Sequence, residues 1–127
     1  SDHLIRNEEL FRRSLQLAEK YAQDGKVVTL GIAPTAPETG YGYIEADQSS
    51  CDEVFAVQKF HEKPAVELAK KYLKAGNFYW NAGIFVFQVD TFWKHLERLQ
   101  PEIVKALSTL KPDLSNLAEC FEKMPNI

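Results

Sequence analysis

The sequence predicts an α/β fold: a mixed, mostly parallel sheet with an antiparallel excursion, followed by helices toward the C-terminal end. A helical repeat from Leu10 to Ala22 precedes the nearly continuous apolar run Val27–Ile32, and a helix followed by a buried strand is half of an α/β unit. Parallel strands are covered on both faces, so such a β-branched run favours parallel pairing. The polar loop Asp47–Glu53 lies between two strand-like runs and predicts the antiparallel excursion.

Composition and charge argue against several classes of function. The chain has 127 residues, about the size of one domain, with 45% hydrophobic and 26% charged residues, as in an ordinary globular protein. Its net charge is −3, so it offers no basic field for nucleic acid, and no window is long and apolar enough to span a bilayer. Cys51 and Cys120 stand far apart without a CxxC pattern, which argues against a zinc site and fits a reducing cytoplasm.

The first predicted element is a helix that begins after Asn7, whose side chain can cap its N-terminus. Glu8 and Glu9 then lie in the first turn, where acidic side chains suit the helix dipole. Apolar residues at helical spacing continue to Ala22, and Gly25 is placed to end the helix.

A shaped loop and two strands follow the first buried strand. Two prolines and two glycines in Ala33–Ile44 predict a loop, and the glycines on both sides of Tyr41 would let backbone approach a ligand closely. An ordinary surface loop that leads into a strand is the alternative interpretation. The strand-like runs are Tyr41–Ala46 and Val54–Phe60.

The stretch Phe60–Pro64 places an acid and a base at the end of a strand, which is where ligands bind in α/β sheets. Lys63 could neutralise a phosphate, and Glu62 could accept hydrogen bonds from hydroxyl groups. Pro64 suits the first turn of a helix, which we expect to run to about Lys74 and to be ended by Ala75-Gly76-Asn77. By itself, this stretch is also typical of an ordinary solvated turn.

A second buried strand is predicted from Ile84 to Val89. Asn81 precedes it, beside the small residues Ala82 and Gly83. The amide of Asn81 can donate and accept hydrogen bonds, and its small neighbours would leave room for a ligand over the start of the strand. We interpret the aromatic residues around Asn81 mostly as core.

The remainder of the chain is predicted to be helical and to carry no chemistry. Asp90 or Thr91 can cap one helix, and Pro101 can open the next. Pro112 breaks that helix, and apolar residues at helical spacing continue over Leu114–Met124.

Three of these stretches, in this order, carry a resemblance: Pro37–Ile44, Phe60–Pro64 and Tyr79–Phe85. Together they closely resemble bacterial mannose-1-phosphate guanylyltransferases, the enzymes that make GDP-mannose. The resemblance covers essentially all 127 residues and includes Ser1–Ile5 and Gly25–Ile32. It implies a Rossmann-like nucleotidyltransferase fold, of which this chain would form the sugar-phosphate half.

The resemblance implies two catalytic residues. Asp2 would hold the catalytic magnesium ion, and Lys63 would hold the sugar phosphate. The attacking phosphate oxygen is already an anion, so no general base is needed, and catalysis would rest on positioning and charge neutralisation.

The resemblance also implies a substrate-binding set around the sugar. Gly42 and its neighbour Tyr41 would lie against the sugar, and Glu62 would accept hydrogen bonds from sugar hydroxyl groups. Lys63 also belongs to this set, because it would bind the phosphate of the sugar phosphate. Asn81 would contact the sugar from the other side.

Departures from the family pattern predict that residues 1–127 form a partial nucleotidyltransferase domain. The glycine-rich loop that would bind the nucleotide should precede Asp2, and a second metal-binding aspartate should follow Ile127. We therefore expect the chain to make no GDP-mannose by itself. His61 replaces what is usually an apolar or small residue, and the sequence assigns it no role.

The implied function of the full-length parent is transfer of GMP from GTP to mannose 1-phosphate, which gives GDP-mannose and pyrophosphate. We expect a cytoplasmic homo-oligomer with no nucleic-acid or membrane partner. One alternative is a glucose-1-phosphate nucleotidylyltransferase, which shares the Gly-Tyr-Gly and Glu-Lys-Pro motifs but less readily the Tyr79–Asn81 segment. The other is a non-catalytic sugar-phosphate-binding or assembly subunit with the same fold.

Overall fold

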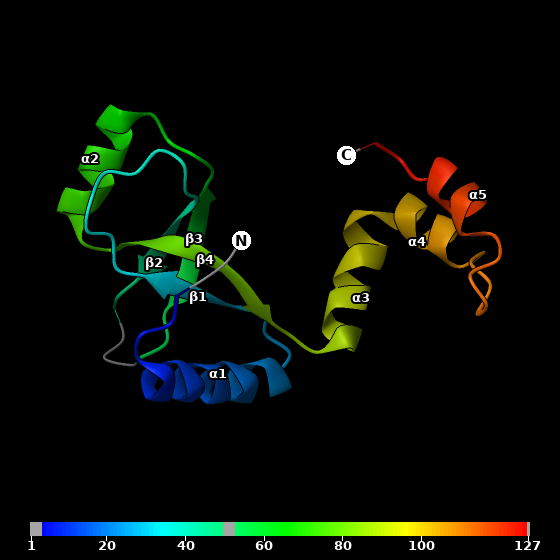
Figure 1. Cartoon of the computed structure of the whole chain (residues 1–127), viewed down its shortest axis with the longest axis horizontal. Coiled ribbons are helices and arrows are strands. Elements are labelled where there is room, and N and C mark those ends of the chain that lie inside the picture. The colour runs from blue at the N-terminus through cyan, green and yellow to red at the C-terminus, as the bar shows by residue number, and fades with distance from the viewer. Residues whose placement is uncertain (1–3, 50–52, 127) are drawn as a thin grey trace. The chain divides into compact units, whose positions relative to one another are not determined.

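A computed structural model of the chain describes residues 4–49 and 53–126, and the chain divides into two compact units (Figure 1). Unit 1 comprises residues 1–18 and 28–86, and unit 2 comprises residues 19–27 and 87–127. Asp2 lies outside the described residues, so its predicted role stays a prediction.

A four-stranded sheet organises unit 1. Its strands are β1 (Val28–Ile32), β2 (Tyr43–Asp47), β3 (Ala56–His61) and β4 (Phe78–Val86), in the spatial order β1-β4-β2-β3. The strand β4, last in the chain, lies between β1 and β2 and runs antiparallel to both, and β2 and β3 also pair antiparallel. The antiparallel excursion predicted around residues 47–53 is therefore the β2–β3 pair.

The α/β class and the C-terminal helices are confirmed, but the mostly parallel sheet is not. Among the described strands every pairing is antiparallel. The run Val27–Ile32 is also not buried on both faces: β1 is an edge strand, and Ile32 is 46% exposed. An apolar β-branched run shows that the side chains suit a covered environment, but it does not specify whether the strand lies at the centre or the edge of a sheet.

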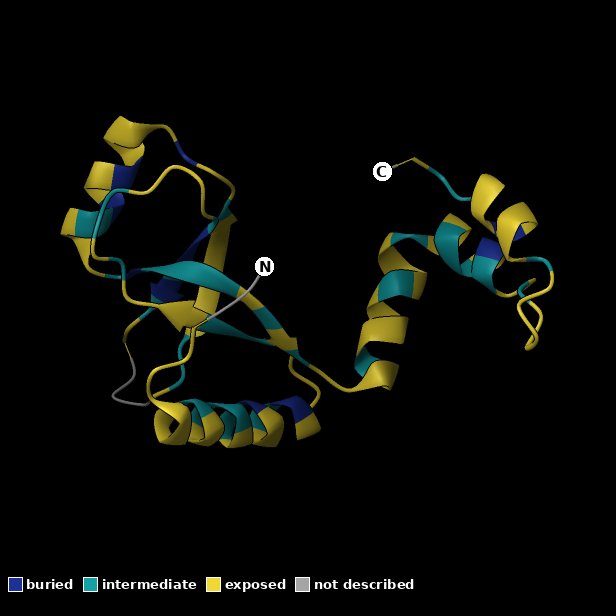
Figure 2. Ribbon diagram, viewed as in Figure 1, coloured by how far each residue is buried: buried dark blue, intermediate teal, exposed yellow. Residues whose placement is uncertain are grey.

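The core of unit 1 joins the sheet to the helix α2 (Val66–Ala75). Its buried members are Tyr43, Ala69, Tyr72 and Phe78, against which Trp80 packs. The rings of Tyr72 and Phe78 are stacked with centroids 4.1 Å apart. In Figure 2 the buried residues of this unit accordingly gather at β2 and α2.

Local signals for the first helix are confirmed. The helix α1 spans Glu8–Gln23, and the backbone N–H of Leu10 donates to Asn7 Oδ1 at 2.9 Å. Gly25, at φ +75°, follows the end of the helix as predicted, since glycine adopts this left-handed conformation without a steric cost.

The start of α2 differs from the prediction. Pro64 is buried, but it precedes the helix: Ala65 is the extended N-cap residue, and the first helical residue is Val66. The extended conformation of Ala65, at ψ 153°, delays the helix by two residues, and Lys63 just before has a left-handed φ of +39°. The predicted end is confirmed, because Gly76 caps the helix at φ +80°.

The strand β4 is longer at its start than predicted. It begins at Phe78 rather than Ile84, so Asn81 lies within the strand rather than before it. It also ends at Val86, and Val89 begins the next helix. The early start has a tertiary cause, because residues 78–80 pair with β2 and the segment from 80 to 86 pairs with β1.

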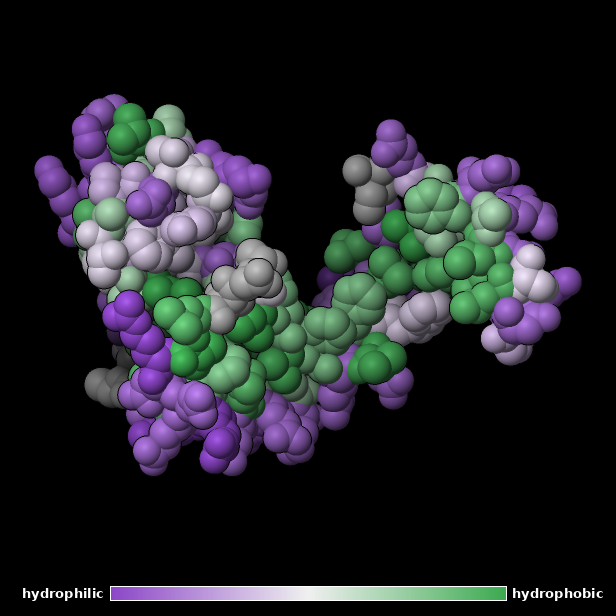
Figure 3. Space-filling view, viewed as in Figure 1, coloured by the Kyte–Doolittle hydropathy of each residue, from purple (hydrophilic) through white to green (hydrophobic). Residues whose placement is uncertain are grey.

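Unit 2 is helical, with α3 (Val89–Leu99), α4 (Pro101–Leu107) and α5 (Leu117–Glu122). Pro101 opens α4 as predicted, whereas α3 is capped by Gln88 rather than by Asp90 or Thr91. No residue of α3 is buried, and apolar side chains reach the surface of this unit in Figure 3. Its exposed large apolar residues are Val27, Phe87, Val89, Phe92, Trp93, Leu99, Leu114, Leu117 and Phe121. In the described part of the chain no helix combines the length and apolar character needed to cross a membrane.

Candidate functional site

The three motifs of the sequence meet around Gly42. On one side, the backbone N–H of Asn81 donates to the carbonyl oxygen of Gly42 at 2.8 Å. On the other side, a Cβ on residue 42 would lie 3.3 Å from Glu62 Oε2 and 2.7 Å from the ring of Phe60. Glycine at this position therefore permits a close approach that any larger residue would disturb.

The register of the sheet explains why these residues converge. Tyr43 lies opposite His61 of β3 and also opposite Trp80 of β4. Both pairings are antiparallel, so one step back along β2 is one step forward along each neighbour. Gly42 is consequently flanked by Glu62 on one side and Asn81 on the other.

The side chain of Asn81 is held in a defined orientation. Its Oδ1 accepts from the backbone N–H of Gly83 at 3.1 Å and lies 3.1 Å from the hydroxyl of Thr29 on β1. A backbone N–H can only donate, so this contact identifies the oxygen of the amide. The amide nitrogen of Asn81 is the group left to donate to a ligand oxygen.

Glu62 and Lys63 form an exposed acid–base pair on the turn after β3. Lys63 Nζ lies 3.4 Å from Glu62 Oε1, and the two side chains are 65% and 61% exposed. Both heads are therefore accessible, and a ligand phosphate would compete with Glu62 for the ammonium group. The positive φ of Lys63 is uncommon outside glycine, so the surrounding structure has to hold this turn.

Tyr41 borders the same place from the loop before β2. Its ring meets Trp80 edge to face, with centroids 5.3 Å apart. Trp80 Nε1 is buried and has no hydrogen-bond partner among the described residues. The loop is tied to β2 because the Tyr43 hydroxyl donates to the carbonyl oxygen of Glu38 at 2.9 Å. Half of the surface of Tyr41 remains exposed beside Gly42.

The structure thus brings together five of the six residues predicted for the site. They are Tyr41, Gly42, Glu62, Lys63 and Asn81. The sixth, Asp2, lies outside the described residues. In the described ranges, 4–49 and 53–126, no group of three His, Cys, Asp or Glu side chains could hold a metal ion.

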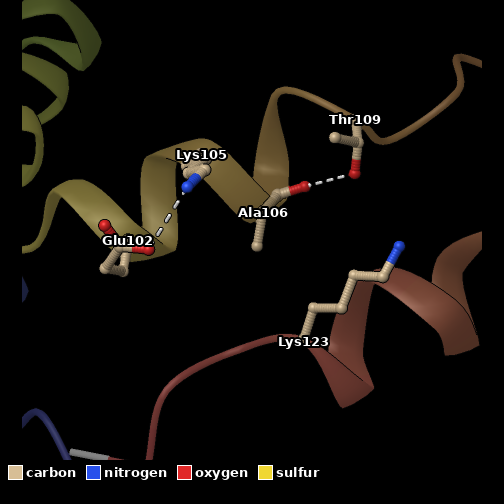
Figure 4. A pocket seen from close by; sticks show the side chains of 5 residues that line it. All are labelled: Glu102, Lys105, Ala106, Thr109 and Lys123. Atoms are coloured by element: carbon tan, nitrogen blue, oxygen red, sulfur yellow. Dashed lines mark hydrogen bonds and ion pairs between the residues drawn. The ribbon is translucent and has the colours of Figure 1, made fainter.

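A surface hollow in unit 2 does not belong to this site. Its volume is about 230 Å³, and Figure 4 shows its lining by α4 and the segment around α5. The lining residues are Glu102, Lys105, Ala106, Thr109 and Lys123, none of which belongs to the three motifs. Both lysines are occupied by ion pairs, Lys105 with Glu102 at 3.9 Å and Lys123 with Glu119 at 2.6 Å.

Sequence reasoning missed the residues that support the site. Thr29 orients Asn81 from a strand 52 positions earlier in the chain. His61, which the sequence left without a role, contacts Glu45 and Tyr72 through its two ring nitrogens. No local pattern marks such contacts, because they depend on which strands become neighbours.

The fold and the converging motifs define a class of protein. Residues 1–124 match the model of the Nucleotidyl transferase family, and the chain belongs to this family. This confirms the nucleotidyltransferase resemblance of the sequence.

Individual relatives are more specific. The chain is 46% identical over 114 residues to the mannose-1-phosphate guanylyltransferase of Salmonella montevideo, which covers 85% of this chain and 24% of that protein. It is 45% identical over 106 residues to the xanthan biosynthesis protein XanB of Xanthomonas campestris pv. campestris, covering 84% of this chain and 22% of that protein. A crystal structure of a mannose-1-phosphate geranyltransferase from Thermus thermophilus superposes with a TM-score of 0.84 at 34% identity, covering 99% of this chain and 37% of that one. The chain therefore spans about a quarter of the length of the curated relatives it matches.

Proposed function

We propose that these residues form the sugar-phosphate-binding portion of a nucleotidyltransferase domain, in a protein that transfers GMP from GTP to mannose 1-phosphate. The observation that carries the proposal is the convergence of Gly42, Glu62 and Asn81 across three strands. The relatives named for guanylyl transfer support the choice of reaction.

Each residue at the convergence has a part in binding. Lys63 neutralises the phosphate of mannose 1-phosphate as a point charge. Glu62 accepts hydrogen bonds from sugar hydroxyl groups, and the amide nitrogen of Asn81 donates to a sugar oxygen from the opposite side. Gly42 lets the sugar approach the backbone, and the exposed edge of Tyr41 covers it.

The chemistry that this arrangement serves is a phosphoryl substitution. An oxygen of the mannose 1-phosphate phosphate forms a bond to the α-phosphorus of GTP, and the bond from that phosphorus to the bridging oxygen breaks. The electron pair leaves with pyrophosphate. The main barrier is the approach of two anions, so Lys63 contributes by charge neutralisation and positioning rather than by proton transfer.

We also propose Asp2 as a magnesium ligand. Magnesium typically binds through one or two carboxylates together with substrate phosphates, and when bound it supplies further charge neutralisation.

A homo-oligomer in the cytoplasm is the proposed state of the protein. Both sheet edges, β1 and β3, carry exposed apolar side chains, among them Ile32, Val57 and Phe60. Such edges tend to pair with further strands or other chains. Light scattering over a dilution series tests this, and a monomer of unchanged mass at every concentration would contradict it.

A product assay tests the proposed activity. The protein that contains this chain is incubated with GTP and, in parallel, with mannose 1-phosphate or glucose 1-phosphate. We expect GDP-mannose and pyrophosphate in equal amounts, with glucose 1-phosphate as the poorer substrate. Preference for glucose 1-phosphate would identify a glucose-1-phosphate nucleotidylyltransferase instead. Binding of mannose 1-phosphate without any turnover would identify a non-catalytic subunit.

A further inference from the structure

The strand β3 ends on a histidine that is fastened at both ring nitrogens. His61 Nε2 lies 3.2 Å from Glu45 Oε2 on β2, and Nδ1 lies 2.9 Å from the hydroxyl of Tyr72 on α2. The side chain of His61 is 19% exposed, so these contacts are largely shielded from water. Three elements distant in the sequence are thereby joined through one ring.

The partners fix one proton position in this group of contacts. A carboxylate only accepts, so Nε2 of His61 carries a proton and donates to Glu45. The hydroxyl of Tyr72 can both donate and accept, so its hydrogen bond to Nδ1 forms in either protonation state of the ring. Burial first, and the charge of Glu45 second, raise the pKa of Tyr72, so this hydroxyl keeps its proton.

Ring packing holds the same histidine in place. Its ring lies 5.0 Å from that of Tyr72 and 5.7 Å from that of Phe78, measured between centroids. Tyr72 and Phe78 are themselves stacked and buried in the core of unit 1. His61 is therefore anchored to the buried aromatic core of unit 1.

The residues directly after His61 are those proposed to bind the sugar phosphate. Glu62 and Lys63 are both exposed, and Lys63 has a φ of +39°, which requires support from neighbouring structure. On the far side Pro64 is buried and leads into α2. The turn is consequently held at His61 on one end and at Pro64 on the other.

We propose that His61, fixed between Glu45 and Tyr72, is a positioning residue that holds the Glu62–Lys63 turn in the conformation that binds the sugar phosphate. This inference rests on the proposed function, because it concerns the same site. It gives a role to a largely shielded residue and to its two partners on separate elements.

Two variants test the inference in the protein that contains this chain. Tyr72→Phe removes one hydroxyl and keeps the stacking on Phe78, whereas His61→Phe keeps an aromatic ring and removes both hydrogen bonds. We expect each to raise the KM for mannose 1-phosphate about two- to tenfold, as for the loss of one or two hydrogen bonds. The KM for GTP and kcat should stay within about twofold of their original values. The double variant should be no worse than His61→Phe, because Tyr72 acts through His61.

Controls separate positioning from folding and from the proposed function. Trp93→Phe, in unit 2, removes the 2.9 Å hydrogen bond that Trp93 Nε1 donates to Glu97, and it should leave both KM values unchanged.

Three outcomes would overturn the inference. If His61 had a merely structural role, its variant would have a lower active fraction, and so a lower kcat, with both KM values intact. A raised KM in Lys63→Met with unchanged KM in Tyr72→Phe and His61→Phe would overturn it while the proposed function stands. Absence of turnover in the unmodified protein would overturn both.

Discussion

The two units of this chain are stabilised over different distances along the sequence. In unit 1, side-chain hydrogen bonds join residues as far apart as Thr29 and Ile84, which are separated by 55 positions. In the described part of unit 2 beyond residue 87, the side-chain hydrogen bonds span from two to eleven positions. Unit 1 has a buried aromatic core, whereas α3 of unit 2 buries no residue.

The difference explains where a binding site can form. Gly42, Glu62 and Asn81 become neighbours only because strands from distant parts of the chain pair in one register. The side-chain hydrogen bonds of unit 2 beyond residue 87 mainly stabilise individual helices and turns, and among the described residues they join none of the three motifs. The candidate site is therefore a product of long-range pairing, and perturbing the two units should have unequal consequences.

The largest expected effect compares two phenylalanines. Phe78→Ala removes a buried ring that stacks on Tyr72 in the core of unit 1, and should lower the free energy of unfolding by about 3–5 kcal/mol. Phe121→Ala removes a side chain that is 73% exposed in unit 2 and should change it by less than about 0.5 kcal/mol. Urea unfolding of this chain, followed by circular dichroism, measures both. Equal losses would show that unit 2 has a core comparable to that of unit 1.

Two lysines give the next comparison, on substrate binding. In the protein that contains this chain, Lys63→Met should raise the KM for mannose 1-phosphate about ten- to hundredfold, because a charge-assisted contact to the phosphate is lost. Lys123→Met in unit 2 removes a lysine already paired with Glu119 at 2.6 Å and should leave this KM unchanged. Steady-state kinetics in which both substrate concentrations are varied measure this KM in each variant. An unaltered KM in Lys63→Met would remove Lys63 from the site.

A comparison of two glutamates should reveal a smaller, selective effect, on the choice of sugar. Glu62→Gln keeps the size of the side chain but weakens its acceptance of hydroxyl hydrogen bonds, so the preference for mannose 1-phosphate over other hexose phosphates should fall about three- to tenfold. Glu102→Gln, in the hollow of unit 2, is the matched control and should not change the preference. Ratios of kcat/KM for competing sugar phosphates measure it. A selective rise in the KM for GTP would instead assign Glu62 to the nucleotide.

The smallest expected effect is on the pH dependence of stability, through one ion pair in unit 2. A hydrogen bond and ion pair with Lys123 lower the pKa of Glu119, and the same contacts raise the pKa of Lys123. The lowered pKa of Glu119 stabilises the fold above the ordinary glutamate range, and this contribution is lost as pH falls through the folded-state value. The raised pKa of Lys123 adds a contribution that is lost as pH rises through its folded-state value.

The unfolding temperature of Glu119→Gln should therefore differ slightly from that of the parent chain at pH 7, and the two temperatures should converge in acid. A constant difference down to about pH 2, below the ordinary range of carboxyl groups, would exclude this pair as the cause.

The sequence was most informative where structure depends on neighbours in the chain. Asn7, Gly25, Gly76 and Pro101 mark helix ends through their own backbone or side-chain chemistry, and all four act as predicted. The antiparallel β2–β3 pair was predicted from the loop between its strands, but the antiparallel pairing of β1 with β4 was not, because an apolar run does not encode which partner lies beside it. The start of β4 was misplaced for the same reason: residues 78–80 become strand by pairing with β2.

The candidate site shows the same division. The resemblance indicated which residues to consider, and the register confirmed that the three motifs lie side by side. The orientation of Asn81 through Thr29 and the anchoring of His61 through Tyr72 required the three-dimensional neighbours. The role of Asp2 stays a prediction.

The spatial order β1-β4-β2-β3 also has a consequence for biosynthesis. On a ribosome, β1 emerges first of the described strands, but the strand it pairs with, β4, emerges last of them. The β2–β3 pair can close early, because few residues separate its strands, whereas β1 has to wait until Phe78–Val86 has left the exit tunnel. During that interval none of the other described strands pairs with β1, whose largely apolar segment a chaperone could recognise. Slowing translation between Ala56 and Val86 should therefore prolong the time for which the nascent chain is prone to aggregate.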